Sequence, residues 1–522
     1  MGNDSTQTDA RRLRLGACVA FLLASVLYLV FILRTHFTVG REIWFTLVDD
    51  AMISMQYAKH LAHGSGLVWN IGEPPIEGFT NPLWTFLMAV AHMLPVPESK
   101  VALVVMLSSA VLLFANTVLV GYLAKQVAPK NSGVPLIAMI LTLFCYPLVY
   151  WSLRGLEVAM VTTAVMACTI LAVRASRSVQ QRLIPLMVIW AGMSFAVATR
   201  LDAVIQTFIV IAYITITRPK LGMRLLALMI LSVVVILTAQ YLYFGDALPN
   251  TYYLKVGGIS VQTRIHLGLD VFFQNALPVL TLPLVVCGLA LALYADLRTK
   301  ETALLGAMFL VQCCYSIWVG GDYAEPHVRT ANRFIVQGLP FLFILSGVAG
   351  SRLVGMAFQK GQPSTSGALP AIAIALCLLI PLSGKQWETW LVNDAEMLDS
   401  DIWRAKRGLT IRECTSKDAL IAVHAAGNIP YFADRRTLDL LGKSDRAIAH
   451  APPKSLFRPG HNRWDYEYSI GQKQPDVVAD EWGRLAIFMS TVMSNRYERM
   501  NSGMYIRNDS TKVDRGRLAG CE

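Results

Sequence analysis

The tetrapeptide Val48-Asp49-Asp50-Ala51 places two adjacent carboxylates just outside the first long apolar segment of the chain. Charged groups are costly near lipid and usually mark a functional site there. Such a pair can act as a base, bind a cation, or do both. Its purely structural role would be to start a helix, with one acid capping the end and the other favouring the first turn. That role explains one carboxylate better than two, so we favour a functional site.

The composition indicates that most of the chain lies in a membrane. Of its 522 residues, 54% are hydrophobic, which is more than a soluble domain carries. The net charge of +11 does not indicate a nucleic acid partner, because much of the excess lies in short loops between apolar runs, as in the positive-inside pattern. Eleven runs are predicted to span the lipid bilayer, at 15–33, 100–123, 134–151, 156–174, 183–199, 203–217, 224–243, 275–294, 301–318, 334–350 and 368–384.

A twelfth apolar run at 82–94 decides the topology. At about 1.5 Å per residue it reaches roughly 20 Å, which is short of the roughly 30 Å hydrocarbon core. If it does not span and the N-terminus is cytoplasmic, every cytoplasmic loop is basic. We therefore predict a polytopic α-helical domain over 1–384, with a first outer loop at 34–99, and a small periplasmic α/β domain over 385–522. The protein is then a multi-pass protein of the bacterial inner membrane.

This topology gathers the polar motifs on the periplasmic face, where a catalytic or binding chamber is expected. They are the acidic pair Asp49-Asp50, the segments 151–157, 200–202, 243–255 and 320–333, and the C-terminal polar region. A transporter is the main alternative that is not an enzyme. It would need charges near mid-span or an inverted repeat, and few charges fall at mid-span here.

Several of these motifs, in order, resemble the GT-C glycosyltransferases that use polyprenyl-phosphate sugars. The segments that carry the resemblance are 49–84, 151–157, 200–203, 243–255, 320–322, 425–431 and 439–445. Within that group they resemble the bacterial arabinofuranosyltransferases that cap mycobacterial arabinan or modify type IV pilin. The resemblance implies a GT-C fold, an inverting transfer of D-arabinofuranose from polyprenyl phosphate to a glycan or pilin-like protein acceptor, and a catalytic carboxylate in the first outer loop. Mannose and aminoarabinose transferases remain alternatives.

Transfer from a lipid phosphate needs a base, positive charge at the leaving phosphate, and alignment of the two substrates. Asp49 and Asp50 are the candidate bases, and Asp49 is preferred because it is the first aspartate after the membrane span. Arg154 is a further possible cation. The candidate ligands of the donor phosphate are Arg200, Lys255, Arg333, His327 and Arg329. The candidate ligands of the sugar or acceptor are Glu77, Asn81, Glu157, Asp202, Asn250, Tyr252 and Asp322.

Two further expectations concern a metal and a disulfide. A pair of carboxylates can hold Mg²⁺, Mn²⁺ or Ca²⁺, so Asp49 and Asp50 are also a possible cation site, although spacing alone does not establish it. Cys414 and Cys521 both fall in the polar C-terminal region. If that region faces an oxidising compartment, the two thiols can form a disulfide.

Overall fold

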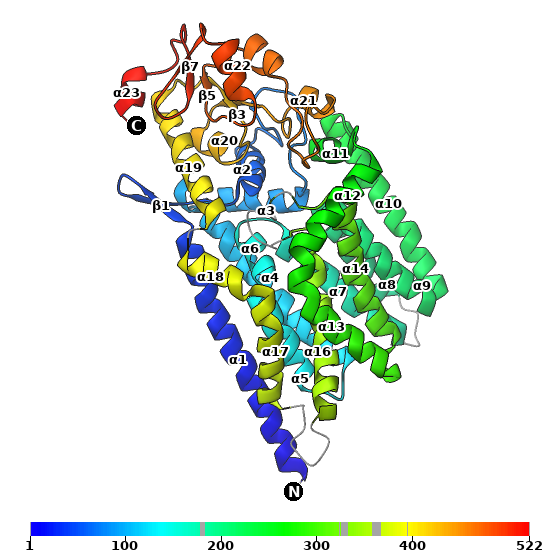
Figure 1. The fold of residues 1–522 in the computed structure, drawn as a ribbon. Coiled ribbons are helices and arrows are strands. Elements are labelled where there is room, and N and C mark those ends of the chain that lie inside the picture. The colour runs from blue at the N-terminus through cyan, green and yellow to red at the C-terminus, as the bar shows by residue number, and fades with distance from the viewer. Residues whose placement is uncertain are drawn as a thin grey trace.

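The computed structural model describes residues 2–177, 183–322, 324, 332–357, 367–393 and 395–520. A long helical bundle carries a smaller domain with a β-sheet at one end, and the N-terminus lies at the opposite end (Figure 1). Within the described residues, eight helices are long and apolar enough to cross a membrane, and a bent pair would make a ninth. The helices of the bundle are α1 (Gly2–Arg34), α4 (Glu98–Val127), α5 (Gly133–Phe144), α6 (Tyr146–Leu153), α7 (Val158–Arg177), α8 (Leu183–Thr199), α9 (Val204–Thr217), α10 (Pro219–Phe244), α12 (Val261–Val271), α13 (Leu277–Leu293), α14 (Lys300–Val319), α16 (Leu339–Ala357) and α17 (Ala368–Leu379).

These helices agree with the predicted spans in position and differ from them in length. The bent pair is α5 and α6, which meet at an angle of 48° after Phe144. The spans predicted at 183–199 and 203–217 are α8 and α9, which fall below the length of the eight. The span predicted at 275–294 is longer than expected, because α12 continues into α13 through a π-helical turn at Phe272–Ala276.

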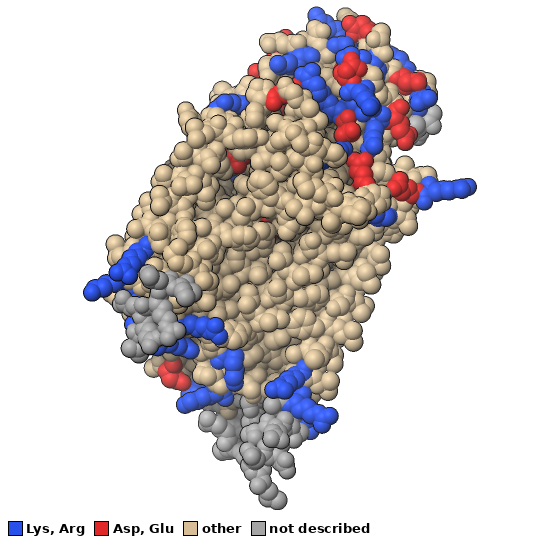
Figure 2. All heavy atoms as spheres, turned by 180° about the vertical axis from the view of Figure 1, so that it is seen from behind, with Lys and Arg blue, Asp and Glu red and all other residues tan. Residues whose placement is uncertain are grey.

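Charged side chains are distributed unevenly along the face of the molecule in Figure 2. Figure 2 shows a broad middle region almost free of charged side chains. Lys and Arg gather at its lower end, whereas the upper end carries both signs of charge. A protein with a lipid-facing belt and a basic cytoplasmic end has this pattern.

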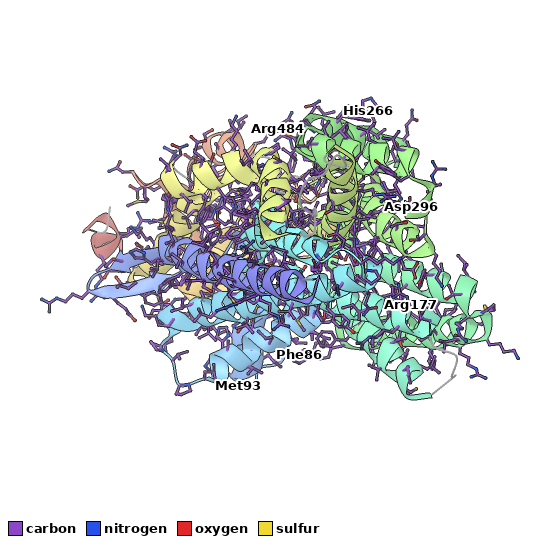
Figure 3. All side chains as sticks on the ribbon, turned by 90° about the horizontal axis from the view of Figure 1, so that it is seen from below. Phe86, Met93, Arg177, His266, Asp296 and Arg484 are labelled. Carbon is purple, nitrogen blue, oxygen red and sulfur yellow. The ribbon has the colours of Figure 1, made fainter. Side chains whose placement is uncertain are left out.

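The first outer loop forms two short helices above the bundle. They are α2 (Asp49–Ala62) and α3 (Pro82–Met93), and a hairpin of β1 (His36–Val39) and β2 (Glu42–Phe45) precedes them. Figure 1 shows α3 lying across the bundle rather than along it. Phe86 and Met93 of α3 point outward at the periphery (Figure 3) and are exposed. An apolar outward face suits a helix at the membrane interface.

The C-terminal domain is built on a five-stranded sheet of order β4-β3-β5-β7-β6. Strands β3, β4 and β5 are mutually parallel, so their carboxyl ends meet at one edge. Strands β6 and β7 complete the sheet in antiparallel pairing. The strands are β3 (Leu420–Val423), β4 (Arg436–Asp439), β5 (Val477–Val478), β6 (Tyr497–Arg499) and β7 (Tyr505–Arg507). The remaining helices are α11 (Asn250–Val256) in the bundle's upper loops, and α18 (Lys385–Val392), α19 (Glu396–Cys414), α20 (Asn428–Ala433), α21 (Arg446–His450), α22 (Leu485–Thr491) and α23 (Arg515–Gly520).

A continuous apolar core joins this domain to the bundle. Leu409 of α19 and Tyr431 and Phe432 of α20 belong to the same buried cluster as the membrane helices. The ring of Phe432 also packs edge-on against Phe37 and Trp44 of the hairpin. The edge of the sheet at which β3, β4 and β5 end is therefore held against the start of α2. The predicted disulfide is not tested, because Cys521 lies outside the described residues.

Candidate active site

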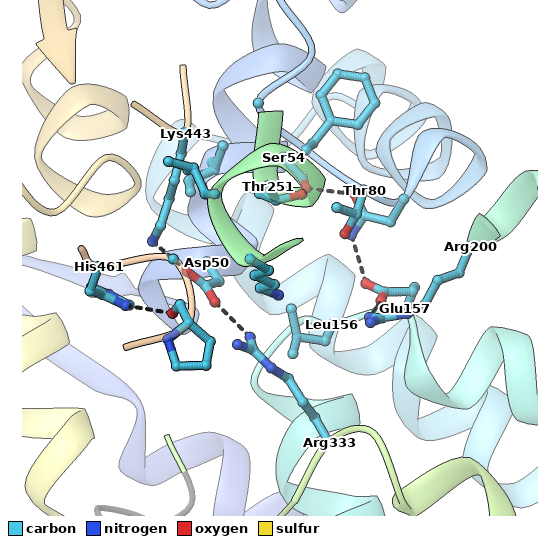
Figure 4. Close-up of a pocket in the computed structure, with 18 residues that line it drawn as sticks. Asp50, Ser54, Thr80, Leu156, Glu157, Arg200, Thr251, Arg333, Lys443 and His461 are labelled. Carbon is cyan, nitrogen blue, oxygen red and sulfur yellow. Dashed lines mark hydrogen bonds and ion pairs between the residues drawn. The ribbon is translucent and has the colours of Figure 1, made fainter. Parts of the chain in front are cut away.

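The acidic pair begins helix α2 and faces both the bundle and the C-terminal domain. Asp49 and Asp50 are its first two residues, and the residue that precedes the helix is Val48. Asp49 Oδ1 accepts a hydrogen bond from the backbone N–H of Asn428, 2.8 Å away. The two oxygens of Asp50 accept from Arg333 Nη1 at 2.6 Å and Lys443 Nζ at 2.9 Å (Figure 4). Both carboxylates therefore contact other segments, which is more than starting a helix requires.

The two neighbouring acids have opposite electrostatic surroundings. Burial raises the pKa of Asp49, and the more distant charges of Arg404 and Lys443 offset this only in part. Burial acts in the same direction on Asp50, but the charges of Lys443 and Arg333 hold the pKa of Asp50 well below its usual range. An acid with a raised pKa accepts a proton more readily than one that is paired with two cations. Asp49 is thus the better base, and Asp50 stays ionised.

Gly427 and Asp439 of the C-terminal domain allow that domain to contact the acidic pair. A Cβ atom on Gly427 would lie 1.8 Å from the carbonyl oxygen of Asp49, so only glycine lets the backbone of α20 approach the acidic pair. The loop after β4 is folded around Asp439, whose carboxylate accepts from the backbone N–H groups of Leu441 at 2.9 Å and Ser444 at 2.6 Å. Lys443 lies between them and reaches Asp50.

A second cluster of polar residues lies on the bundle side of Asp50. Glu157 accepts from Arg200 and, at 2.7 Å, from Asn81 Nδ2. Arg200 also donates from Nε to both oxygens of Asp202, at 2.8 and 2.9 Å. Asn81 Oδ1 accepts from Ser54 at 2.7 Å, which connects the cluster to α2. Figure 4 shows Ser54, Glu157 and Arg200 of this cluster on the wall of the same pocket as Asp50.

Lys255 is a cation of this site that has no carboxylate partner in the part of the chain that the structure describes. Among the described residues it makes neither an ion pair nor a hydrogen bond, and its Nζ lies 5.2 Å from the centre of the Phe334 ring. Burial, together with the nearby charges of Arg333 and Arg200, lowers the pKa of Lys255 to about 7. A bound anion would relieve both effects.

Two adjoining cavities meet at these cations. A polar pocket of about 70 Å³ lies beside Asp50, Glu157 and Lys443. A larger cavity of about 240 Å³ extends from it between α8, α9, α10 and α14, where its walls are mainly apolar. Four residues line both cavities, namely Thr80, Arg200, Thr251 and Lys255.

The other predicted ligands are distributed around these cavities. Asp202 and Tyr252 line the apolar cavity, as does Glu77, whose pKa burial raises to about 8. Asn250 is buried behind them, and its backbone N–H donates to the carbonyl oxygen of Glu77 at 3.0 Å. Asp322 is buried and forms an ion pair with Arg333 Nε at 3.2 Å. His327 and Arg329 lie outside the described residues.

The idea that Arg154 binds the phosphate is wrong. Its side chain is fully buried, and Nη2 lies 2.5 Å from Asp401 Oδ2. Nη1 donates to the carbonyl oxygen of Thr46 at 3.2 Å, so Arg154 fixes the segment that leads to the acidic pair. The position of Arg154 in an outer loop did not show that it would pair with Asp401, 247 residues later in the chain.

Sequence reasoning missed the contribution of the C-terminal domain to this site. Lys443 and Asn428 contact the acidic pair directly, and Arg404 lies close enough to influence Asp49. The segments 425–431 and 439–445 did carry a resemblance signal. Nothing local in them, however, indicated that they would reach the first outer loop.

The donor set does not fit a divalent cation held by the acidic pair. Each oxygen of Asp50 is already bound by a cationic side chain. Within the residues that the structure describes, no group of three or more His, Cys, Asp or Glu side chains is placed to hold a metal. A Mg²⁺ or Ca²⁺ site normally supplies several oxygen ligands.

Comparison with known proteins shows the fold of the chain. A family model described as a domain of unknown function, DUF8728, matches residues 395–513. No curated protein matches the chain. The structure of ArnT from Cupriavidus metallidurans bound to undecaprenyl phosphate is similar over 81% of this chain and 85% of that chain, with 12% identity and a TM-score of 0.50.

Oligosaccharyltransferase structures from Archaeoglobus fulgidus are similar as well. One, a complex with Zn and sulfate, has 11% identity and a TM-score of 0.52. The similarity covers 80% of this chain and 62% of that chain. Another, AglB with an inhibitory peptide and a dolichol-phosphate, has 10% identity and a TM-score of 0.53, and the similarity covers 95% of this chain and 74% of that chain. The chain therefore has the GT-C fold, with a small α/β domain at its C-terminus.

Proposed function

We propose that this protein is an inverting glycosyltransferase that moves a sugar from polyprenyl phosphate to an acceptor hydroxyl. The junction of the two cavities carries this proposal. Lys255, a cation that has no carboxylate partner among the described residues, lies where a polar pocket opens into an apolar cavity. A ligand with an anionic head and a long apolar tail suits such a site.

The donor would lie across this junction. Its phosphate would contact Lys255, with Arg200 and Arg333 adding positive charge from either side. Those two arginines are already paired with carboxylates, so Lys255 is the principal phosphate ligand. The polyprenyl chain would extend into the apolar cavity, and the sugar would face Asp50 in the polar pocket. ArnT was solved with undecaprenyl phosphate and AglB with dolichol-phosphate, which supports a donor of this class.

Asp49 would act as the base. Its carboxylate takes the proton of the acceptor hydroxyl while that oxygen forms a bond to the anomeric carbon. The bond between the anomeric carbon and the phosphate oxygen breaks, and its electron pair stays on the polyprenyl phosphate. Lys255 stabilises the charge that develops there. Attack on the face opposite the leaving group inverts the anomeric centre.

D-arabinofuranose is the sugar that we propose, on the resemblance of the outer-face motifs. Aminoarabinose and mannose are the alternatives. The charge distribution in Figure 2 supports a site on the periplasmic face, because the polar pocket lies at the end whose surface carries both signs of charge, opposite the end where Lys and Arg predominate.

The test is to incubate the purified full-length protein with a panel of polyprenyl-phosphate sugars and a crude envelope fraction as acceptor. Consumption of polyprenyl-phosphate arabinofuranose, with release of polyprenyl phosphate, is the expected result. Consumption of only the mannose or aminoarabinose donor would change the proposed sugar and leave the proposed mechanism unchanged. If no donor is consumed and none binds, the proposed function is wrong.

A further inference from the structure

A third cavity lies on the other side of the acidic pair, between the bundle and the C-terminal domain. Its volume is about 220 Å³. It shares Asp50 and Arg333 with the polar pocket, so the ion pair between them forms part of both walls. Asp49 lines this third cavity and does not line the polar pocket. The better base therefore faces away from the proposed donor site, toward a separate space.

The carboxyl ends of three parallel strands form one side of this cavity. Its lining contains His424 after β3, Lys443 after β4 and Trp482 after β5. Ligands of open α/β sheets bind at this edge, where strand ends leave a crevice between their loops. Ten of the sixteen described residues that line the cavity come from 395–513, the segment that matches DUF8728.

The chemistry of the lining suits a hydroxylated ring. The indole of Trp482 is partly exposed, and its centre lies 5.4 Å from that of the His461 ring and 6.3 Å from that of the His424 ring. Arg404 is a polar donor beside it. Its Nε is buried and has no hydrogen-bond partner among the described residues, and its Nη1 lies 3.6 Å from the nearest Asp401 oxygen. A flat aromatic face with a few convergent polar groups is typical of a small-molecule site.

The same lining is less suited to a peptide. Extended peptides are bound largely through main-chain hydrogen bonds. At the end of β3, the backbone N–H groups of His424 and Ala425 already donate to Asp480, at 2.8 and 3.2 Å. Those backbone donors are not available to a second chain, so recognition here depends on side chains.

We propose that this cavity is the acceptor site and that the acceptor is a carbohydrate, with a sugar ring against Trp482 and one hydroxyl at Asp49. This inference rests on the proposed function. The hydroxyl gives its proton to the Asp49 carboxylate, and its oxygen bonds to the anomeric carbon presented from the polar pocket. The bond from that carbon to the phosphate oxygen breaks, and the electron pair leaves with the phosphate. Arg404 binds a neighbouring acceptor oxygen.

The experiment compares acceptors and variants with the full-length protein in liposomes and the donor that it consumes. The acceptors are arabinan, mannan and glucan oligosaccharides, and pilin-like peptides that contain serine and threonine. The variants are Trp482→Ala, Trp482→Phe and, as a matched control, Trp403→Ala. Trp403 is an exposed tryptophan of the same domain that lies outside the cavity lining. The KM for acceptor and the Kd for donor are measured separately.

We expect transfer to an oligosaccharide. Trp482→Ala should raise the KM for that acceptor by about tenfold or more, with donor affinity unchanged, because one aromatic contact is lost. Trp482→Phe should restore much of the loss, and Trp403→Ala should behave as the wild type. Arg404→Gln should give the same separation between acceptor KM and donor Kd, and it replaces Trp482→Ala if that variant does not fold.

Three results would overturn the inference and leave the proposed function intact. They are transfer to peptides alone, donor consumption without any oligosaccharide product, and an acceptor KM that none of the cavity variants changes. A loss of donor affinity in Trp482→Ala would assign the cavity to the donor and also overturn the inference. Failure of the wild type to bind or consume any donor is the separate result that removes the proposed function.

Discussion

Two ion pairs between an arginine and an aspartate lie close to the start of α2, and their surroundings differ. Arg154 and Asp401 are 2.5 Å apart, and both side chains are fully buried. Arg333 and Asp50 are 2.6 Å apart, but 14% and 36% of their side chains are exposed, and both line two cavities. An enclosed pair holds segments together, whereas a pair on a cavity wall can also contact a substrate.

The enclosed pair supports the open one through a single residue. Asn428 donates from Nδ2 to Asp401 at 3.3 Å and from its backbone N–H to Asp49 at 2.8 Å. Asp401 belongs to α19, and Asn428 begins α20. The position of the proposed base therefore depends on the C-terminal domain. Arg154 and Asp401 position the site, whereas Asp49 is the residue proposed to react.

The largest effect should come from breaking the enclosed pair. Arg154→Leu leaves Asp401 buried without its partner, which typically costs about 3–5 kcal/mol of stability. We expect a large fall in the Tm of the purified protein, followed by intrinsic fluorescence on heating. The double variant Arg154→Leu with Asp401→Leu should recover much of that loss, because neither charge of the pair then remains without its partner. A single variant as stable as the wild type would show that the pair is not structural.

The second effect concerns the acidic pair. Asp49→Asn keeps the shape of the side chain but removes its ability to take a proton, so turnover should fall by roughly 100-fold or more. Donor affinity should persist, because the cations hold the phosphate. Asp50→Asn is the matched comparison, and its effect on turnover should be smaller, since Asp50 is paired with two cations. Near-normal turnover in both variants would move the base to Glu157, Asp202 or Asp322.

Sequence reasoning found the features that depend on local pattern. Apolar runs and loop charge identified the bundle, and the helix start at the acidic pair and the short helix at Pro82 follow from neighbouring residues. These elements depend on interactions between residues that are close in the chain.

The partners of the acidic pair depend on contacts that the sequence pattern does not reveal. Lys443 is 393 positions from Asp50, and Asn428 is 379 positions from Asp49. Arg154 and Lys255 are both basic residues of outer loops, and only their packing shows that one is enclosed and the other faces a cavity. Gly427 lies in one of the segments that carry the resemblance, and only the structure shows that glycine is needed there for the close backbone approach to Asp49.

A third prediction concerns Lys255 and pH. Because its pKa is lowered to about 7, Lys255 is charged below that pH and loses its charge above it. Affinity for the anionic donor should therefore fall as the pH rises from 6 to 8, by up to about tenfold per pH unit above the pKa. Lys255→Arg stays charged throughout and should remove this dependence. Donor titrations at several pH values check it, and the same pH profile in both proteins would exclude Lys255 as the phosphate ligand.

The smallest effect on transfer is expected at Glu77, which is as buried as the enclosed pair yet lies on a cavity wall. Its pKa of about 8 keeps the carboxyl protonated at pH 7. Glu77→Gln has a similar shape and also carries no charge, so turnover and donor affinity should change by no more than about twofold at that pH.

The dependence of stability on pH gives the complementary test of Glu77. Between about pH 5 and 8 the unfolded chain has released the proton of Glu77 while the folded protein retains it, so the wild type loses stability as the pH rises. The glutamine side chain does not titrate. The Tm of the variant should therefore increase relative to that of the wild type as the pH rises over this range. Parallel Tm curves would show that Glu77 is ionised in the folded protein, and a large loss of turnover at pH 7 would assign its carboxylate a role in transfer.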